Sequence, residues 1–154
     1  MYSSAEASAI RQQFWTRFGM YMSPVPSATQ EKVNWVNYKT GIKGISFKMD
    51  VNKQTAFVAV EIFLKEIMLQ HQYFEIFNNF ATQFEGFVGK GWQFTHNDFI
   101  EHKGHVSSIT VELKNVNVFR QEDWPQMIAF LKLHIIGLDA FWASYKTAFE
   151  LLNL

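Results

Sequence analysis

Hydrophobic and polar residues alternate most regularly between Trp35 and Phe63. Every second residue is apolar from Ile45 to Val51, and the same period returns from Ala56 to Ile62. A two-residue period is typical of strands with one buried face. The polar pair Asn52-Lys53 predicts the hairpin turn between these two strands.

The residues before this hairpin predict one more strand. It would be centred on Trp35 and joined to the next strand by a turn at Tyr38-Lys39-Thr40-Gly41, where Gly41 is free to adopt a positive φ. The stretch as a whole therefore predicts three consecutive antiparallel strands.

A turn centred on Asn52-Lys53 also predicts a register, in which Asp50 faces Thr55 and Lys48 faces Phe57. One face of the hairpin is then continuously apolar, and we expect helices to cover it. The opposite face is mixed in chemistry and carries Ser46, Lys48, Asp50, Thr55, Phe57, Ala59 and Glu61. A slip by one residue would bury charged side chains, so the assignment of faces is firm.

Three segments change to the helical period, with apolar residues three or four apart. They are Ser3 to Met22, Lys65 to Phe87, and Trp124 to the end of the chain. Ser3 and Glu6 form a capping-box pattern. Phenylalanines recur along the second segment and predict a helix face packed in the core. Two further alternating runs, Trp92 to His96 and Ile109 to Leu113, predict a second hairpin.

The element order is helix, three strands, helix, two strands and a long C-terminal helix. Consecutive hairpins without a strand-helix-strand crossover predict an α+β fold with an antiparallel sheet of about five strands. The length of 154 residues is typical of a single domain spanning residues 1–154.

Composition narrows the classes of function. Lysine and arginine number 14, as do aspartate and glutamate, so nucleic acid stays a possible partner that the charge does not support. Cysteine is absent, which excludes thiolate zinc sites and cysteine nucleophiles. Neither a signal peptide nor a membrane span is expected from the pattern, and we expect a cytoplasmic protein. Aromatic residues make up 17% of the chain, so some of them are candidates for an interface.

The chain also resembles a known family from Phe14 to about Phe149. The segments that carry the resemblance are FWTRFGMYM, VNWVNYKTGIKGISFKMD, AFVAVEI and NVFRQEDWPQMIAFLKLHIIGLDAFW. They look like the bacterial domain of unknown function 4268, of the kind met as a short stand-alone protein in Bacteroidetes. The family implies no established activity. Some members resemble fusions behind a restriction-nuclease-like domain, which implies a role beside DNA-acting enzymes, but this chain contains no such domain.

Two catalytic hypotheses can be weighed on the residues themselves. A restriction-type nuclease needs two carboxylates and a lysine around one metal, and Asp50 with Glu61 is the candidate pair. The expected lysine position holds Phe63, and the predicted register separates the two carboxylates by about 20 Å at ~3.3 Å per residue. His96, His102 and His105 lie close in sequence, but no carboxylate completes a zinc site at a suitable spacing.

We therefore expect a non-catalytic interaction module, without a cofactor, that binds a protein partner or forms a homo-oligomer. The alternative is a metal-dependent nuclease-like enzyme or a small-ligand binder that uses the mixed face of the sheet. In either case the candidate binding residues are Tyr38, Lys39, Lys43, Lys48, Phe57 and Glu61.

Overall fold

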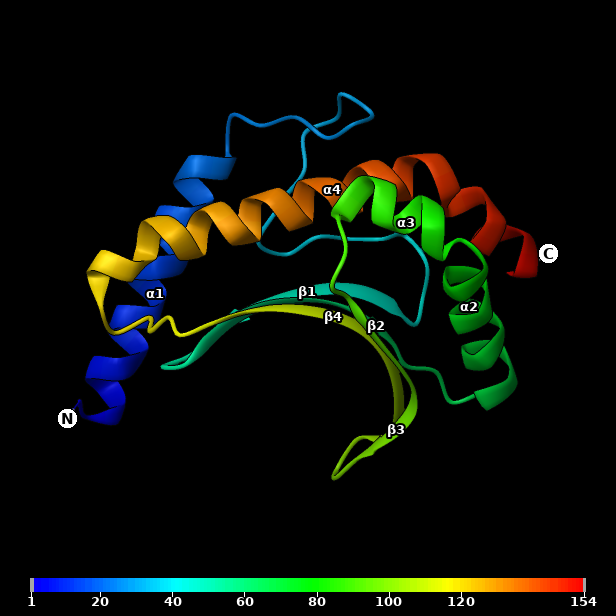
Figure 1. Ribbon diagram of the computed structural model, residues 1–154, viewed down its shortest axis with the longest axis horizontal. Helices are drawn as coiled ribbons and strands as arrows, with labels where there is room; N and C mark the ends of the chain where they lie inside the picture. The colour runs from blue at the N-terminus through cyan, green and yellow to red at the C-terminus, as the bar shows by residue number, and fades with distance from the viewer. Residues whose placement is uncertain (1, 154) are drawn as a thin grey trace.

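The structure is a computed structural model, and it describes residues 2–153. It is an α+β fold in which helices pack on a four-stranded antiparallel sheet (Figure 1). The elements in chain order are α1 (Ser4–Met22), β1 (Ile45–Val51), β2 (Thr55–Ile62), α2 (Ile67–Asn79), α3 (Ala81–Val88), β3 (Gln93–Ile100), β4 (Gly104–Lys114), a short 3-10 turn η1 (Gln121–Asp123), α4 (Trp124–Glu150) and a second one, η2 (Leu151–Asn153).

The sheet is strongly curved, and its strand order is β1-β2-β4-β3. In Figure 1 the long helix α4 runs across the convex side, with α1 at one end of the sheet and α2 and α3 at the other. The β3–β4 hairpin curls away from the helices, so the concave side of the sheet faces downward in that view.

The expected strand at Trp35 does not form, and the sheet has four strands rather than five. Residues 33–44 are turns and irregular chain that side chains hold in place. The indole N–H of Trp35 donates to the carbonyl of Val25 at 2.9 Å, and the carbonyl of Thr40 accepts from the indole of Trp142 at 2.7 Å. The Thr40 carbonyl is thus satisfied by a side chain instead of a strand ladder, and the Trp35 side chain is tied to the preceding loop. Gly41 has the expected positive φ, at 79°.

The predicted register of the first hairpin was wrong by two residues. Asp50 pairs with Phe57 and Lys48 with Ala59, because the turn is centred on Lys53-Gln54 and not on Asn52-Lys53. The amide N–H of Asn52 donates to the carbonyl of Thr55 at 2.9 Å, which closes the ladder. A shift by two leaves every side chain on its expected face.

The helical segment after β2 is two helices, not one. It breaks at Phe80, whose φ of −98° and ψ of 20° lie outside the helical range. Two asparagines, which are weak helix formers, precede the break. The bend lets α3 approach α4 closely: a Cβ built on Gly137 would lie only 2.5 Å from the carbonyl oxygen of Phe87.

The predicted second hairpin forms, but its strands are longer than expected. They leave a turn of only Glu101, His102 and Lys103 between β3 and β4. The Ser3–Glu6 capping box is confirmed, with both reciprocal bonds at 3.1 Å.

The core is rich in aromatic rings, as the phenylalanine pattern predicted. Phe77 is fully buried, and its ring centroid lies 5.9 Å from that of Phe141 and 4.7 Å from that of Phe149, both on α4. Phe84 from α3 and Trp142 from α4 complete this aromatic cluster. The C-terminal half of α4 therefore packs on α2 and α3.

Contrary to expectation, one segment, Gln121–Glu150, is long and apolar enough to cross a membrane by length and composition. Half of its most apolar stretch is buried inside the protein. Its buried residues include Leu131, Ile135 and Leu138. Such burial is typical of a core helix, which passes the same test as a span.

Candidate functional site

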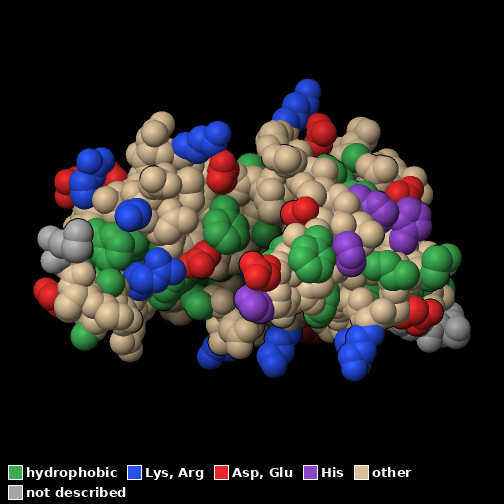
Figure 2. Space-filling model, turned by 90° about the horizontal axis from the view of Figure 1, so that it is seen from below, with side chains coloured by type: hydrophobic (Ala, Val, Ile, Leu, Met, Phe, Trp, Pro, Cys, Tyr) green, Lys and Arg blue, Asp and Glu red, His purple; other side chains and the backbone are tan. Residues whose placement is uncertain are grey.

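The concave face of the sheet carries no helix within the described residues (Figure 1), and the strand pairing arranges its side chains in rows across the strands. Many of the central side chains are small or carry hydroxyl groups. The rows are Ser46–Glu61–Ser108–Thr95, Lys48–Ala59–Thr110–Gln93 and Asp50–Phe57–Glu112. Figure 2 shows this side as a hollowed surface on which acidic, basic and hydrophobic side chains are interspersed.

Glu61 is the centre of an ion-pair cluster on this face. Its Oε1 accepts a hydrogen bond from Lys48 Nζ at 3.1 Å and another from Lys103. Lys103 lies in the turn of the curled hairpin, 5.4 Å from the ring centroid of Phe63. Partial burial of Glu61 favours its neutral form, but the hydrogen bonds from Lys103 and Lys48 outweigh that effect and lower its pKa. The cluster therefore fastens the hairpin turn to the sheet.

This lowered pKa predicts an acid-dependent loss of stability. A carboxylate whose pKa is lower in the folded state contributes stability above its unfolded pKa of 4.5, and loses it as the pH falls through the folded value. We expect the Glu61→Gln variant to be less stable than wild type at neutral pH, and the difference to shrink as the pH falls below 4.5 and through the lower folded pKa of Glu61. Urea unfolding midpoints measured across this range test the prediction.

The matched control is Glu101→Gln in the hairpin turn, where the carboxylate is largely exposed. The urea unfolding midpoint of Glu101→Gln should equal that of wild type at every pH. A constant difference between Glu61→Gln and wild type at every pH would contradict the assigned ion pairs.

Asp50 anchors the first helix to the edge of the sheet. Its Oδ1 accepts from Arg11 Nη2 at 2.7 Å and from the amide N–H of Val51 at 2.8 Å. Arg11 also donates to the carbonyl of Val51. Both carboxylates of the nuclease hypothesis are thus paired with cations.

The corrected register also keeps these two carboxylates apart. Asp50 faces Phe57, which is four residues from Glu61 on β2, or about 13 Å at ~3.3 Å per residue. Carboxylates that share a metal ion both lie within a few ångströms of it. The geometry does not support a shared metal at Asp50 and Glu61.

The predicted binding residues divide between two sides of the sheet. Lys48, Phe57 and Glu61 share the concave face, as expected. Tyr38 lies on the helix side, where its ring stacks on Phe47 at a centroid distance of 5.2 Å.

Lys39 lines a cavity on the helix side, and Lys43 is exposed in the loop before β1. The reason is that residues 33–44 form a loop along the helices instead of a strand in the sheet. The sequence pattern predicted Tyr38 and Lys39 at an end of the sheet near its mixed face; in the structure both line the helix-side cavity, and Tyr38 also borders a hollow that Lys48 and Phe57 line.

Sequence reasoning missed a buried carboxylate at Asp139 of α4, which is 3% exposed. Its oxygens accept from the Tyr38 hydroxyl at 2.6 Å, the Ser27 hydroxyl at 3.0 Å and the Ala28 amide at 2.7 Å. Burial, reinforced by the hydrogen bond to this carboxylate and by its charge, raises the pKa of Tyr38 above its ordinary value. An aspartate inside the apolar run IIGLDAFW was the available signal.

A cavity of about 310 Å³ lies beside this carboxylate. Its walls come from the loop before β1 and from the last turns of α4, and Lys39, Lys146, Glu31 and Glu150 contribute charges of both signs. Asp139 itself links that loop to α4 through three neutral donors, so its first role is structural.

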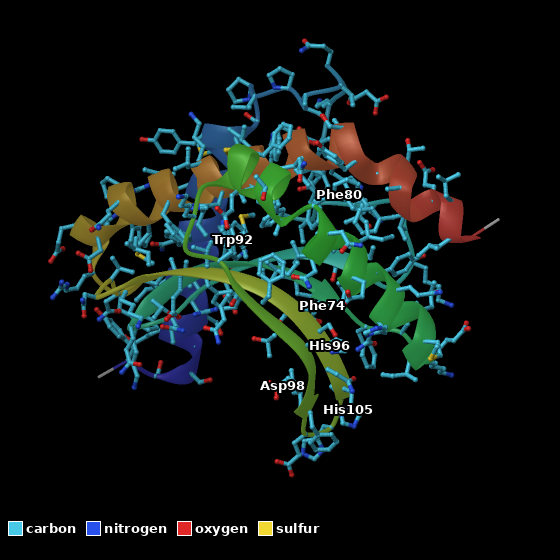
Figure 3. All side chains as sticks on the ribbon, turned by 45° about the vertical axis from the view of Figure 1, so that its right-hand side comes forward. Phe74, Phe80, Trp92, His96, Asp98 and His105 are labelled. Atoms are coloured by element: carbon cyan, nitrogen blue, oxygen red, sulfur yellow. The ribbon has the colours of Figure 1, made fainter. Side chains whose placement is uncertain are left out.

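The histidines do not gather as a metal site. In Figure 3, His96 lies beside Phe74, and His105 and Asp98 lie farther along the hairpin. His96 Nε2 is 3.0 Å from His71 Nδ1 on α2, a partner that sequence spacing did not indicate. An irregularity in the ladder between Thr95 and Asp98 accompanies this arrangement. Among residues 2–153, no group of three or more histidine, aspartate or glutamate side chains is placed to hold a metal ion.

Comparison with known protein families gives a match over most of the chain. The model of the family described as "Domain of unknown function (DUF4268)" matches residues 10–146. Neither a curated protein nor a solved structure matches the chain.

Proposed function

The chain belongs to the DUF4268 family, and we propose that it is a non-catalytic module that binds a partner protein through the concave face of its sheet. The observation that carries the proposal is a sheet face that no helix of residues 2–153 covers (Figure 1). Its floor mixes one half-buried aromatic ring, Phe57, with small and hydroxyl side chains such as Ala59 and Thr110.

The charges on this face support a protein partner over nucleic acid. Its basic residues lie next to acidic ones, as in the pairs Lys48–Glu61, Arg11–Asp50 and Lys114–Glu112. A face that binds phosphates usually presents a basic excess, and its affinity falls steeply with salt. Paired charges around a polar and aromatic floor are instead typical of the rim of a protein interface.

The proposal includes two finer points. We place the module in the cytoplasm, and we place its partner among the DNA-processing or restriction-type systems that the family resemblance implies. Identifying the partner tests both the cytoplasmic location and the class of system.

Substituting Thr110 with arginine tests the concave face. Thr110 lies half-buried in the central row, so a long charged side chain there would fill the hollow while its guanidinium reaches solvent. We expect a protein captured from the native lysate by the tagged wild-type chain to be lost with Thr110→Arg, and identification by mass spectrometry measures this. The matched control, Leu133→Arg, places the same residue on α4, where Leu133 is 67% exposed.

Each outcome decides the proposal. A protein retained by wild type and Leu133→Arg but lost with Thr110→Arg supports it. A partner that binds both variants equally, or recovery of the chain alone, would overturn it. A metal-dependent hydrolytic activity that Glu61→Ala abolishes would favour the nuclease-like alternative instead.

A further inference from the structure

The outer edge of β1 has a defined set of outward backbone groups. β1 is an edge strand of the sheet. The amide of Asn52 bonds the carbonyl of Thr55, and the amide of Phe63 bonds the carbonyl of Gly44 at 2.8 Å. Hydrogen-bonded pairs alternate along an antiparallel ladder, so even-numbered β1 residues bond β2. The odd-numbered residues, Ile45, Phe47, Met49 and Val51, therefore direct their N–H and C=O groups outward.

The protein itself closes both ends of this edge. At Ile45, the carbonyl accepts from the Thr40 hydroxyl at 2.7 Å and the amide donates to the carbonyl of Ile42 at 3.2 Å. At Val51, the carbonyl accepts from Arg11. Blocking the ends of an edge strand is a common protection against unwanted pairing.

The middle of the edge stays open. The amide of Val51 is satisfied by the Asp50 carboxylate at 2.8 Å. By contrast, the outward groups of Phe47 and Met49 have no hydrogen-bond partner within residues 2–153. Two donors and two acceptors at strand spacing thus remain available over the stretch 47–49. This pattern is complementary to the backbone of an extended chain.

A hollow of about 270 Å³ lies beside the same stretch. Loop residues Val36, Asn37 and Tyr38 form one wall, and Phe57 contributes from the concave face. Val36 is 45% exposed, so the hollow offers an apolar surface next to the free backbone groups. A side chain projecting from an added strand has a place to bind there.

We propose that the β1 edge binds an extended segment of a partner protein by strand addition at Phe47–Met49, with an apolar side chain of that segment in the hollow. The inference rests on the proposed function for the kind of partner, a protein, and adds the β1 edge of the same sheet as the surface that an extended segment of that partner contacts. The loop at residues 36–42 and helix α1 flank the short open stretch. They leave room for a single extended chain at Phe47–Met49. A second copy of the chain would bring its own α1 and its own loop against these flanks.

Met49 allows a direct test, because its amide N–H points away from β2. Proline at an edge position of this kind removes the outward donor and leaves the β1–β2 ladder intact. Met49→Ala is the matched control, since it loses the same side chain and keeps the donor. The probe is a displayed library of random linear peptides selected on the wild-type protein, followed by titration of the selected peptides.

We expect the selected peptides to bind Met49→Ala and to bind Met49→Pro at least about tenfold more weakly. N-methylation of alternate peptide amides should abolish binding in the same way, and this measurement does not depend on the folding of Met49→Pro. Equal affinity for both variants, or a library that yields no binder, would overturn the inference.

Peptides that Thr110→Arg no longer binds but Met49→Pro still binds would support the concave face as the binding surface and overturn the edge. If the wild-type chain is a dimer and Met49→Pro is a monomer, the edge binds a second copy of the chain. That result would also overturn the inference.

Discussion

Replacing Asp139 with alanine is expected to lower the free energy of unfolding by about 3–5 kcal/mol. The substitution leaves three donors, Tyr38 Oη–H, Ser27 Oγ–H and the Ala28 amide, without their acceptor. Each lost bond to a charged group costs about 1.5–3 kcal/mol, and the loss of the desolvated charge offsets part of the sum. Urea unfolding measures the effect, and amide exchange should show the loop at residues 23–44 opening first.

The control is Asp98→Ala on the β3 strand, where the carboxylate is exposed. A change of no more than about 0.5 kcal/mol is expected there. The loss of unfolding free energy in Tyr38→Phe should lie between those of Asp139→Ala and Asp98→Ala. This substitution removes one of the three donors to Asp139 and keeps the ring that stacks on Phe47. If Asp139→Ala unfolds at the wild-type midpoint, the carboxylate does not hold the loop.

The second large effect is expected at Phe77, the centre of the aromatic cluster. Truncation of a fully buried phenylalanine to alanine costs about 3–5 kcal/mol through lost burial and a residual cavity. The ring of Phe77 contacts rings from both α3 and α4, so its removal should weaken the packing of these two helices against each other. The measurement is the urea midpoint together with the slope of the transition.

Phe99→Ala is the matched control for this substitution. Phe99 is 65% exposed and contacts the ring of His105. Its truncation should change stability by less than about 1 kcal/mol. A loss at Phe99 equal to that at Phe77 would show that the cluster around Phe77 is not the stabilising core.

Alternation predicted the faces of the hairpin but not its pairing. Side chains repeat every two residues along a strand, so a register shift of two is invisible to the pattern. The turn decides between the two registers, and Asn52, Lys53 and Gln54 offered several plausible centres. The side chain of Asn52 accepts from the amides of Gln54 and Thr55, both at 2.8 Å, and this local bonding selects the observed turn.

The candidate site was predictable only where it lies on regular strands. The sequence correctly placed Lys48, Phe57 and Glu61 on one face of the sheet. Side chains alternate between the two faces along each strand, so the face of each residue follows from its position in the pattern. Tyr38 and Asp139 are 101 residues apart in sequence, and nothing local indicates that they meet. Likewise, the contact between His71 and His96 depends on how α2 packs against β3, which is a tertiary property.

The position of α4 after all four strands and after α2 and α3 has a consequence for protein synthesis. Because α4 covers the convex side of the sheet and the aromatic rings of α2, that side stays unprotected while the ribosome is still making the helix. Nascent chains grow by about 5–20 residues per second, so the 27 residues of α4 prolong this exposure by seconds. Chains released before Trp124 would present a large apolar surface, and we expect them to aggregate or to be retained by chaperones.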